Sequence, residues 1–406
     1  MRFIYHHRTA GRGGEGLHIT SVVSALRALG HDVMVISPPG VDPMRTADAV
    51  PLDKGDVASS GLSRLWKLVT CSFPQFAFEL AEVLYNVYAT VRLLPVLRRD
   101  KGAVYYERYA LFLWAGVWLA KALDHRVILE VNEVAGVERA RSYAFVTLAQ
   151  WLERRTFAKA DEILTVSSFL QREVLNRGGR EGHVHLRPNA IDPKRFGGRE
   201  QRRDRIRSRL GLTGTTVLGF VGWFDRWDRL DRLVDLLEKL QPTHAAARLL
   251  LVGDGPVAAE LTAVISREGL EGRIVLSGPV PRDEVPDYID AMDICILPDS
   301  NTFGSPIVLF EFMAMGKAVI APNVQPVLDV LSDGVTGFIV NRQDNEALLR
   351  AVIRLLDGPE LTRQIGEAAR STVLARHTWV AVASFVERLA ADHVDASVPA
   401  TMPVAL

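Results

Sequence analysis

Short apolar runs rich in β-branched residues alternate with longer segments of helical period along most of the chain. The first series is FIYHH, HITSVVSALRALG, DVMVISP, AVYYERY and RVILEV. After residue 190 the alternation begins again with TTVLGFVGW, RLDRLVDLLEKL and ARLLLVGDG. Strands that alternate with helices in this way form parallel sheets. The pattern therefore predicts an α/β fold with two Rossmann-like βαβ domains, and a length of 406 residues agrees with two domains that face a central cleft.

The boundary between these domains falls in a stretch with the composition of a linker. Residues 188–193 read PNAIDP, and a charge-rich surface segment covers residues 197–209. This places a hinge near residue 190, with an N-terminal domain at 1–190 and a C-terminal domain at 191–378. The final residues, 396–406, contain prolines and small side chains without a helical period, so we predict a disordered tail there.

One segment, residues 61–101, does not fit a plain Rossmann-like domain. It carries many large apolar residues beside several arginines, Trp66 and Phe73 among the former. These apolar residues have two interpretations: they form a helix face that packs on the domain core, or an amphipathic surface that contacts a membrane. The uncharged stretches of the chain are too short to span a bilayer.

Composition narrows the function classes. Lysine plus arginine number 48 and aspartate plus glutamate also number 48, so no net field attracts nucleic acid. The only two cysteines, Cys71 and Cys295, lie far apart and outside any metal-ligand spacing. The N-terminus reaches His6, His7 and Arg8 without the apolar centre of a secretory signal. We expect a cytoplasmic protein without a bound metal.

Glycine turns follow two predicted strands. Gly11, Gly13 and Gly16 form a GxGxxG run before a helix, but the second strand ends at Ser37 and prolines, without the acidic residue of a nicotinamide site. The loop can still admit an anion or a sugar hydroxyl to backbone N–H groups, or it is only a tight turn. Gly253 lies in a second turn of this kind, at the end of RLLLV.

The most informative stretch is NTFGSPIVLFEFMAMGK, residues 301–317. A Gly-Ser-Pro turn leads into an apolar helix that contains one carboxylate, Glu311. A charge in that setting costs several kcal/mol unless something pairs with it. A ribose diol and a buried arginine are the two candidate partners.

This stretch resembles the donor-binding segment of the retaining GT-B glycosyltransferases of family 4 (group 1). Three further stretches agree with that family in order and spacing: RGGEGLHITSVVSALRALGHDV, LRPNAIDPKRF, and the run from GFVGWFDRWDRLDRL through LLLVGDGP and LSGPVPRDEVPDYIDAMDICILP. The resemblance covers nearly the whole chain. It implies a GT-B fold, in which the segment at about 379–395 is the helix that crosses back to the first domain.

The resemblance also implies a donor site. Glu311 matches the family glutamate that holds the donor ribose, and Gly14 matches the glycine loop that faces the donor. Backbone groups at the start of the helix would bind the sugar and phosphates, and glycines at two strand ends would line the site; these residues are Gly304, Ser305, Pro306, Ile307, Val308, Gly222 and Gly253.

Three family positions carry different residues. Phe303 replaces the first glutamate of the E-x7-E motif, so Asn301 or Ser305 would have to recognise the sugar hydroxyls. Trp223 and Asp228 replace the diphosphate-binding arginine and lysine. Because guanidinium groups bind phosphate oxygens in pairs, we predict that the nearby Arg226 and Arg229 substitute for them, with surface solvation as the alternative.

In the N-terminal half, LEVNE occupies the strand end where many family members have a histidine and an aspartate. Asn132 and Glu133 stand there, and Asn132 cannot act as a base. Glu133 or Glu107 is the predicted catalytic base, if the reaction uses one. Arg108 and Glu130 are predicted on the acceptor side, and a structural role for each of these residues stays open.

The implied activity is transfer of a hexosyl group from a UDP- or GDP-sugar to a hydroxyl of a glycan or lipid-linked acceptor, with retention, in polysaccharide or glycoconjugate biosynthesis. No cofactor or metal is expected. Two alternatives stay open, a sugar-nucleotide epimerase of the same fold and a non-catalytic glycosyltransferase-like subunit. If residues 61–101 contact a membrane, the protein works at its inner face.

Overall fold

The computed structural model describes residues 1–11, 13–46, 75–137, 144–197 and 200–396, and it contains two parallel six-stranded sheets. The first sheet has the order β2-β1-β3-β4-β5-β6. Its strands are β1 Arg2–His6, β2 Asp32–Ile36, β3 Val104–Arg108, β4 Val127–Val131, β5 Glu162–Thr165 and β6 Val184–Leu186. The second sheet has the order β12-β11-β10-β7-β8-β9. Its strands are β7 Thr216–Trp223, β8 Ala247–Asp254, β9 Ile274–Gly278, β10 Ile294–Ile296, β11 Ala318–Pro322 and β12 Phe338–Val340.

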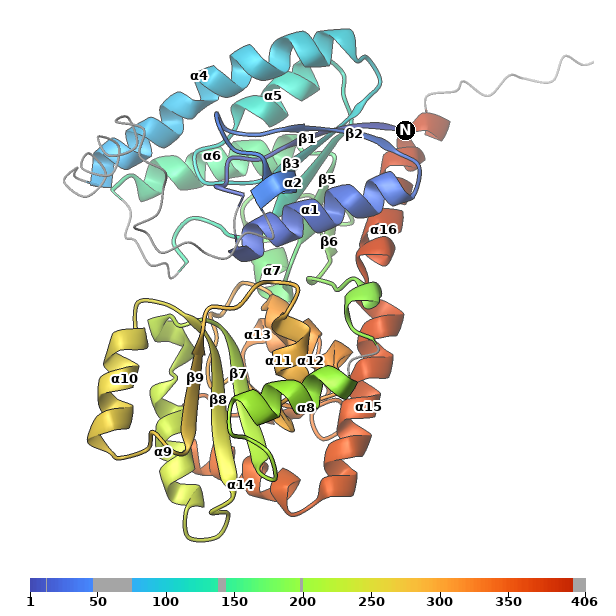
Figure 1. The fold of residues 1–406 in the computed structure, drawn as a ribbon. Coiled ribbons are helices and arrows are strands. Elements are labelled where there is room, and N and C mark those ends of the chain that lie inside the picture. The colour runs from blue at the N-terminus through green and yellow to red at the C-terminus, as the bar shows by residue number, and fades with distance from the viewer. Residues whose placement is uncertain (12, 47–74, 138–143, 198–199, 397–406) are drawn as a thin grey trace, which may run out of the picture.

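Helices cover both faces of each sheet, as parallel sheets require (Figure 1). In the first domain they are α1 Gly13–Ala28, α2 Pro43–Thr46, α4 Gln75–Arg99, α5 Ala115–Ala122, α6 Val146–Lys159 and α7 Ser168–Asn176. In the second they are α8 Glu200–Arg209, α9 Asp231–Leu240, α10 Ala258–Arg267, α11 Val285–Asp290, α12 Ile307–Ala314, α13 Gln325–Leu328, α14 Asn345–Leu356 and α15 Pro359–Arg376. The predicted two-domain α/β fold is confirmed.

The alternation of side chains along the strands divides the core of the first domain into two layers. One apolar cluster joins α4, α5, α6 and α7 to one face of the sheet, and another joins α1 and the last helix, α16 Trp379–Ala396, to the opposite face. Residues next to each other on β3 and β4 therefore point to opposite layers. This alternation decides which strand-end side chains can reach the cleft.

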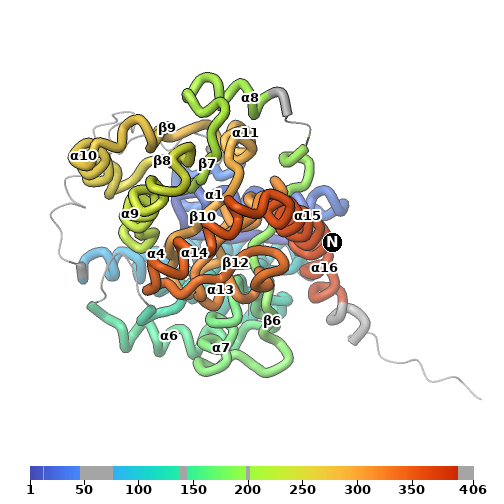
Figure 2. Tube along the Cα trace, turned by 90° about the horizontal axis from the view of Figure 1, so that it is seen from below, coloured from blue at the N-terminus to red at the C-terminus, as the bar shows by residue number. Residues whose placement is uncertain are grey.

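The chain passes between the domains twice, and the two passages lie side by side. Ile191 pairs with Thr378, its N–H donates to His377, and Trp379 N–H donates back to Ile191. From there α16 runs along the first domain, as Figures 1 and 2 show. The predicted hinge near residue 190 and the predicted crossover helix both fall in this region.

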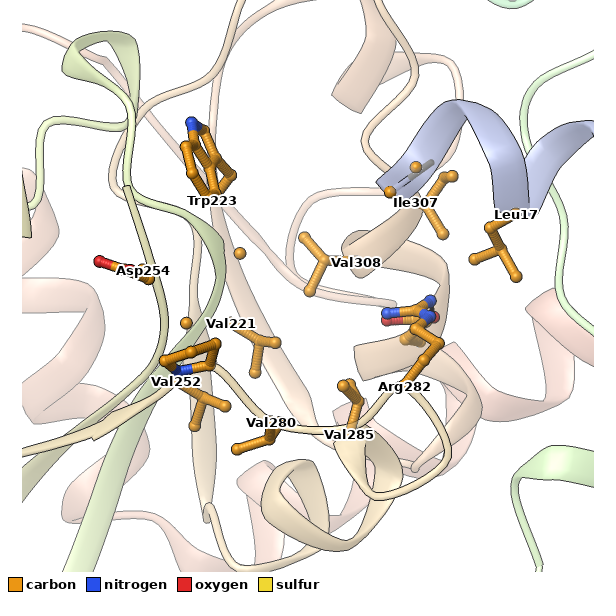
Figure 3. Close-up of a pocket in the computed structure, with 16 residues that line it drawn as sticks. Leu17, Val221, Trp223, Val252, Asp254, Val280, Arg282, Val285, Ile307 and Val308 are labelled. Carbon is orange, nitrogen blue, oxygen red and sulfur yellow. Dashed lines mark hydrogen bonds and ion pairs between the residues drawn. The ribbon is translucent and has the colours of Figure 1, made fainter. Parts of the chain in front are cut away.

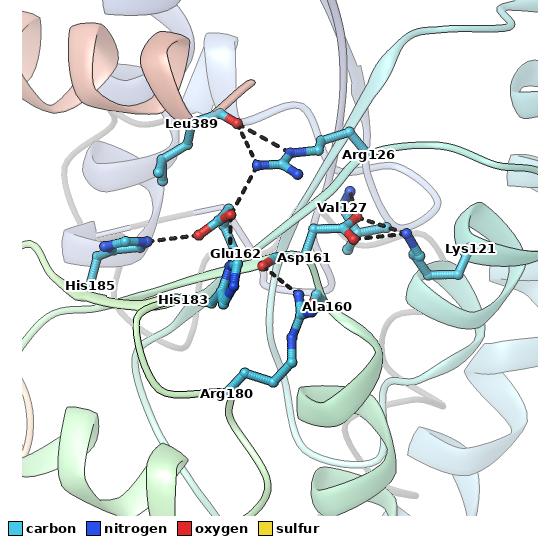
Figure 4. A network of polar contacts seen from close by, with 10 residues as sticks. All are labelled: Lys121, Arg126, Val127, Ala160, Asp161, Glu162, Arg180, His183, His185 and Leu389. Atoms are coloured by element: carbon cyan, nitrogen blue, oxygen red, sulfur yellow. Dashed lines mark hydrogen bonds and ion pairs between the residues drawn. The ribbon is translucent and has the colours of Figure 1, made fainter. Parts of the chain in front are cut away.

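A polar network holds the distal part of α16 to the first domain (Figure 4). Arg126 donates two hydrogen bonds, 2.9 and 3.1 Å long, to the carbonyl of Leu389, and a further one to Glu162. Glu162 also accepts from His183 and His185. Burial alone would raise the pKa of Glu162, but these histidines and Arg126 lower it below its usual value. The carboxylate stays charged and keeps Arg126 in place.

The apolar segment at 61–101 can be examined from residue 75 onward. Ala89, Leu93 and Leu97 of α4 are fully buried in the first domain, so one side of the helix packs on the core. A second set of apolar side chains on α4 is exposed to solvent. Trp66 and Phe73 lie outside the described residues, as does the predicted disordered tail from residue 397 onward.

Candidate active site in the cleft between the domains

The carboxyl ends of the two sheets face each other across a cavity of about 590 Å³ (Figure 3). Residues of α1 form one wall, and the ends of β7 and β8, the loop after β9 and the start of α12 form the other. The lining residues are Gly13, Gly14, Leu17, Val221, Gly222, Trp223, Val252, Gly253, Asp254, Pro279, Val280, Arg282, Val285, Ile307, Val308 and Glu311. This is the position at which open α/β sheets bind ligands.

Two helix N-termini meet at this cavity. A Cβ atom on Gly14, near the start of α1, would lie 3.7 Å from Cδ1 of Ile307, the first residue of α12. The first N–H groups of a helix have no intrahelical partner and carry a partial positive charge. An anion placed between α1 and α12 would be stabilised by both helices.

Glycine is required at the turns that shape the walls. A side chain at Gly16 would place Cβ 2.3 Å from the carbonyl oxygen of Gly11, so the GxGxxG run does form a tight turn. Gly253 has a φ of +134°, and its Cβ would lie 1.9 Å from the oxygen of Gly222. These glycines let backbone pack on backbone, and Gly14 next to them leaves the cleft open.

Glu311 is buried in the cavity wall, with an exposed fraction of 4%, and its carboxylate pairs with the guanidinium of Arg282. Arg282 lies in the loop between β9 and α11 and also lines the cavity, as Figure 3 shows. An arginine, partly exposed rather than buried, is therefore the partner of Glu311. The other oxygen, Oε2, has no hydrogen-bond partner among the described residues.

A second cavity, of about 470 Å³, shares part of its wall with the first and lies between the domains. Its lining from the N-terminal domain includes Arg108, Asn132, His18 and Asn189. Glu130 organises these side chains. Its Oε1 accepts from Arg108 and Asn132 at 2.7 Å, and its Oε2 accepts from Tyr106 at 2.6 Å.

Glu130 is a buried anchor in this cluster. Burial would raise its pKa, but the charge and hydrogen bonding of His18, with Arg108 and Tyr106, hold the pKa well below its usual range. A carboxylate with so many donors is a weak base. Arg108 and Asn132 reach the cavity, and Glu130 fixes their orientation.

His18 and Asn189 are site residues that the sequence analysis did not single out. His18 Nε2 lies 2.8 Å from Glu130 Oε1, and Nδ1 lies 2.7 Å from Asn189 Oδ1. His18 follows Gly14 by four residues on α1, so both lie on one face of the helix. This spacing of four residues was the sequence signal that could have identified His18 as a site residue.

The prediction of Glu107 as a base is wrong, because this residue lies in the interior of the domain. Its side chain is completely buried, with Oε2 2.6 Å from His6 Nδ1 and hydrogen-bonded to Tyr105. Glu107 and Arg108 are neighbours on β3, so they point to opposite faces of the sheet. Glu133 is half-buried after β4 and is not among the residues that line the two cavities.

The prediction that Arg226 and Arg229 bind the diphosphate is also wrong in this structure. Both residues line a separate cavity on the outer side of the C-terminal domain, and Arg229 pairs with Asp231 at 2.7 Å. The short 3₁₀ helix η2, Arg226–Asp228, directs them away from the cleft, and Arg229 adopts a left-handed conformation with a φ of +50°. Both side chains are solvated on the protein surface, which was the alternative interpretation.

The family's cation positions instead carry an exposed tryptophan and an acid. Trp223 is 49% exposed and lines both cleft cavities, and Asp228 lines the second one. Burial raises the pKa of Asp228 to about 7, and the negative charges of Asp225 and Asp299 contribute to the increase. This carboxyl changes its charge near neutral pH, at the place where a phosphate is expected.

Phe303 serves contact between the domains, in place of the family glutamate. Its ring packs against the apolar cluster of the first domain, and its carbonyl accepts a 2.6 Å hydrogen bond from Ser167 Oγ. Asn301 Oδ1 accepts from Gly304 N at 2.5 Å, and Ser305 Oγ accepts from Asn189 N at 3.1 Å. The N–H of Gly304 is thus occupied within the loop, while Ser305 and Pro306 line the second cavity.

Among the described residues, no group of three or more histidine, cysteine or acidic side chains is arranged to hold a metal ion. The expectation that the protein uses no metal stays a prediction.

Comparisons with known proteins agree with this architecture. A family model described as Glycosyltransferase Family 4 matches residues 12–195, and one described as Glycosyl transferases group 1 matches residues 202–372. The α-D-kanosaminyltransferase of Streptomyces kanamyceticus is 27% identical over 68% of this chain and 71% of its own. A GDP-mannose-dependent α-(1-6)-phosphatidylinositol monomannoside mannosyltransferase of Mycolicibacterium smegmatis is 26% identical over 65% and 72%.

Solved structures show the fold over nearly the whole chain. Anabaena HepE in complex with UDP has a TM-score of 0.71 at 16% identity and covers 97% of this chain and 100% of that one. Sucrose-phosphate synthase from Thermosynechococcus elongatus has a TM-score of 0.71 at 19% identity, with 98% and 100% covered. With the two family models placed end to end on its two domains, the chain belongs to the group 1 (family 4) glycosyltransferases and has their GT-B fold.

Proposed function

We propose that this glycosyltransferase transfers a hexosyl group from a UDP- or GDP-sugar to a hydroxyl of a glycan or lipid-linked acceptor, with retention and without a metal or cofactor. The observation that carries the proposal is the cavity between the N-termini of α1 and α12, which ends at the buried carboxylate Glu311. Its size suits a nucleotide sugar, because small-molecule sites usually enclose about 300–1,000 Å³. Retention is proposed from the family alone.

The donor would lie across the cavity. The apolar floor of Val221, Val252 and Val280 suits a base, and the carboxylate of Glu311 can accept hydrogen bonds from the ribose diol. The diphosphate would then lie between the two helix N-termini, where fixed dipoles stabilise the charge of the leaving group. Arg282 is the one arginine or lysine among the described residues that line this cavity, and we assign it to the donor as well.

The acceptor would enter through the second cavity. Arg108 and Asn132 present donors there and are oriented by Glu130. Contacts between the domains at Phe303 and Ser305 would exclude water while the activated sugar is bound, which limits hydrolysis.

Known proteins support the choice of donor. HepE has been crystallised with UDP and glucose, and the mycobacterial relative is GDP-mannose-dependent by name. These relatives use different nucleotides, so the proposal keeps both UDP and GDP.

Thermal unfolding of the purified chain with UDP, GDP, ADP and NAD tests the proposal. A ligand at 100 times its Kd stabilises the folded state by about 2.7 kcal/mol. We expect stabilisation by UDP or GDP that is lost in Glu311→Gln and kept in Glu238→Gln, a change on the exposed surface of α9. Stabilisation by NAD alone, or by no nucleotide, would refute the donor assignment.

A further inference from the structure

Two helices of the first domain expose an unusual amount of apolar surface. Half of the exposed large apolar side chains among the described residues lie on α4 and at the start of α6. They are Phe76, Leu80, Leu84, Val87, Val91, Phe145, Leu148 and Trp151, with exposed fractions between 41% and 67%. Their spacing of three and four residues places them on one side of each helix. Contiguous apolar patches of this kind mark interaction surfaces.

The two helices form one surface. Both oxygens of the Glu79 carboxylate, on α4, accept hydrogen bonds from the backbone at the start of α6, from Ala144 N at 2.6 Å and from Phe145 N at 2.7 Å. Between them lies α5, which packs on both helices. Figure 1 shows α4, α5 and α6 on the same side of the first domain, away from α1 and α16.

Although α4 is long and apolar enough to cross a bilayer, its packing excludes that role. Its inner face is part of the domain core, and Asn86 fixes it to the neighbouring chain. Asn86 Nδ2 donates to Phe112 O at 2.7 Å, and Asn86 Oδ1 accepts from Trp114 N and Ala115 N. The helix is held along the surface of a folded domain.

The charges on the two helices have one sign at the surface. Exposed cations follow the apolar stripes and are Arg92, Arg98, Arg99, Arg154, Arg155 and Lys159. Of the acidic residues on these helices, Glu79 and Glu153 are buried, and Glu82 pairs with Arg8 at 3.0 Å. In the part of the chain that the structure describes, exposed cations outnumber anions beside this apolar face, and Asp100, directly after α4, pairs with Arg99. Such a face is complementary to an anionic lipid surface.

We propose that α4 and α6 form a docking surface for an anionic phospholipid bilayer, with α4 lying in the plane of the membrane. The apolar side chains enter the boundary between head groups and acyl chains, and the arginines and Lys159 contact lipid phosphates. Docking does not depend on the donor assignment. If the proposed function holds, it brings the cleft to a membrane where a lipid-linked sugar acceptor resides.

Vesicle flotation of the purified full chain tests this proposal. The protein should float with vesicles of phosphatidylglycerol and phosphatidylcholine, and less with phosphatidylcholine alone or in 1 M NaCl, because salt screens the arginines. The double variant Leu84→Glu/Val87→Glu should reduce binding at least tenfold. The control Val335→Glu, at an equally exposed apolar position of the second domain, should bind as the parent does.

A separate variant tests the electrostatic contribution of the arginines to membrane binding. Arg154→Gln/Arg155→Gln should weaken binding to anionic vesicles by about fivefold for each arginine and leave binding to neutral vesicles unchanged. Arg172→Gln/Arg205→Gln removes the same charge from exposed positions on α7 and α8, and should have little effect. All variants change exposed side chains, and thermal unfolding confirms that each is folded.

Three results would overturn the proposal. The first is failure of the parent to float with any vesicle, and the second is a loss of binding in the control variants as large as in the variants of α4 and α6. The third is a dimer of the parent in solution that Leu84→Glu/Val87→Glu converts to a monomer without changing flotation. That result would assign the apolar face to a second copy of the chain.

Discussion

At the scale of single residues, Glu311 and Arg282 neutralise each other's charge in the wall of the donor cavity. Glu311 is almost fully buried, and Arg282 is partly exposed. Removing one partner of a buried pair leaves an uncompensated charge, at a cost of about 3–5 kcal/mol when both groups are buried. Because Arg282 keeps contact with water, we expect a smaller loss, about 2 kcal/mol, in Arg282→Met.

Urea unfolding of a double-mutant cycle measures this coupling. Arg282→Met should be destabilising alone, and Arg282→Met/Glu311→Gln should recover much of the loss because no charge stays buried. Equal losses in the single and double variants would show that Arg282 acts by packing alone.

Asp228 predicts a pH dependence of nucleotide binding. Its pKa is raised to about 7, and it lines the second cavity, which shares Gly14 and Ile307, at the two helix N-termini, with the donor cavity. An anion binds better when this carboxyl is neutral, so affinity for UDP should fall as pH rises from 6 to 8, by up to about tenfold if the proton is required. Calorimetric titration of the parent and of Asp228→Asn measures the effect, and the variant should have the flatter profile. Parallel profiles would assign the pH dependence to the nucleotide.

The same residue affects stability in a defined pH range. A carboxyl whose pKa is higher in the folded state than in the unfolded state contributes most below the unfolded value of 3.8, and the contribution is lost as pH rises through about 7. Asp228→Asn carries no such charge. Its stability relative to the parent should therefore increase between pH 4 and pH 8, as denaturant unfolding at several pH values would show.

At the scale of helices and strands, Gly253 at the end of β8 determines the shape of the donor cavity. Gly253→Ala would place Cβ against the oxygen of Gly222 in a conformation that L residues rarely adopt. We expect a loss of about 2 kcal/mol or more and weaker nucleotide binding. Gly272→Ala, where a new Cβ meets no atom within 4 Å, is the matched control. Equal unfolding midpoints for the two variants would contradict this role of Gly253.

The hydrophobic period and the positions of the glycines were enough to predict the helices and strands, because the patterns of buried strands and amphipathic helices are local in the sequence. The alternation of side chains along β3 also indicated that Arg108 and Glu107 cannot both reach the cleft, since neighbours on a strand point to opposite faces of the sheet. The direction of Arg226 and Arg229 could not be read from the sequence, because it follows from the path of the short helix η2 and from the left-handed conformation of Arg229 at its end. The pairing of Glu311 with Arg282 joins helix α12 to the loop before α11, 29 residues earlier, and only the residue types were predictable.

At the scale of the whole molecule, His18 and Asn189 connect the acceptor side of the cleft to both chain passages. The ring of His18 lies edge-on to Trp379, with ring centroids 4.9 Å apart, and approaches Asn189 in the other passage. Asn189 in turn donates to Ser305 of the second domain, from Nδ2 to the carbonyl at 2.6 Å. The position of the second domain is thus coupled to the residues that would bind the acceptor.

Asn189→Ala should loosen this coupling without unfolding either domain. The variant loses the side-chain contacts to Ser305 and His18, so the ligand-free protein should open and show a larger radius of gyration in solution X-ray scattering. Turnover with a donor and an acceptor should fall, with kcat reduced more than donor affinity, because the donor contacts lie elsewhere in the second domain. Asn176→Ala, at the exposed end of α7, controls for loss of an asparagine. An unchanged radius together with reduced turnover would mean that Asn189 acts within the acceptor site, through His18, and that domain closure does not depend on it.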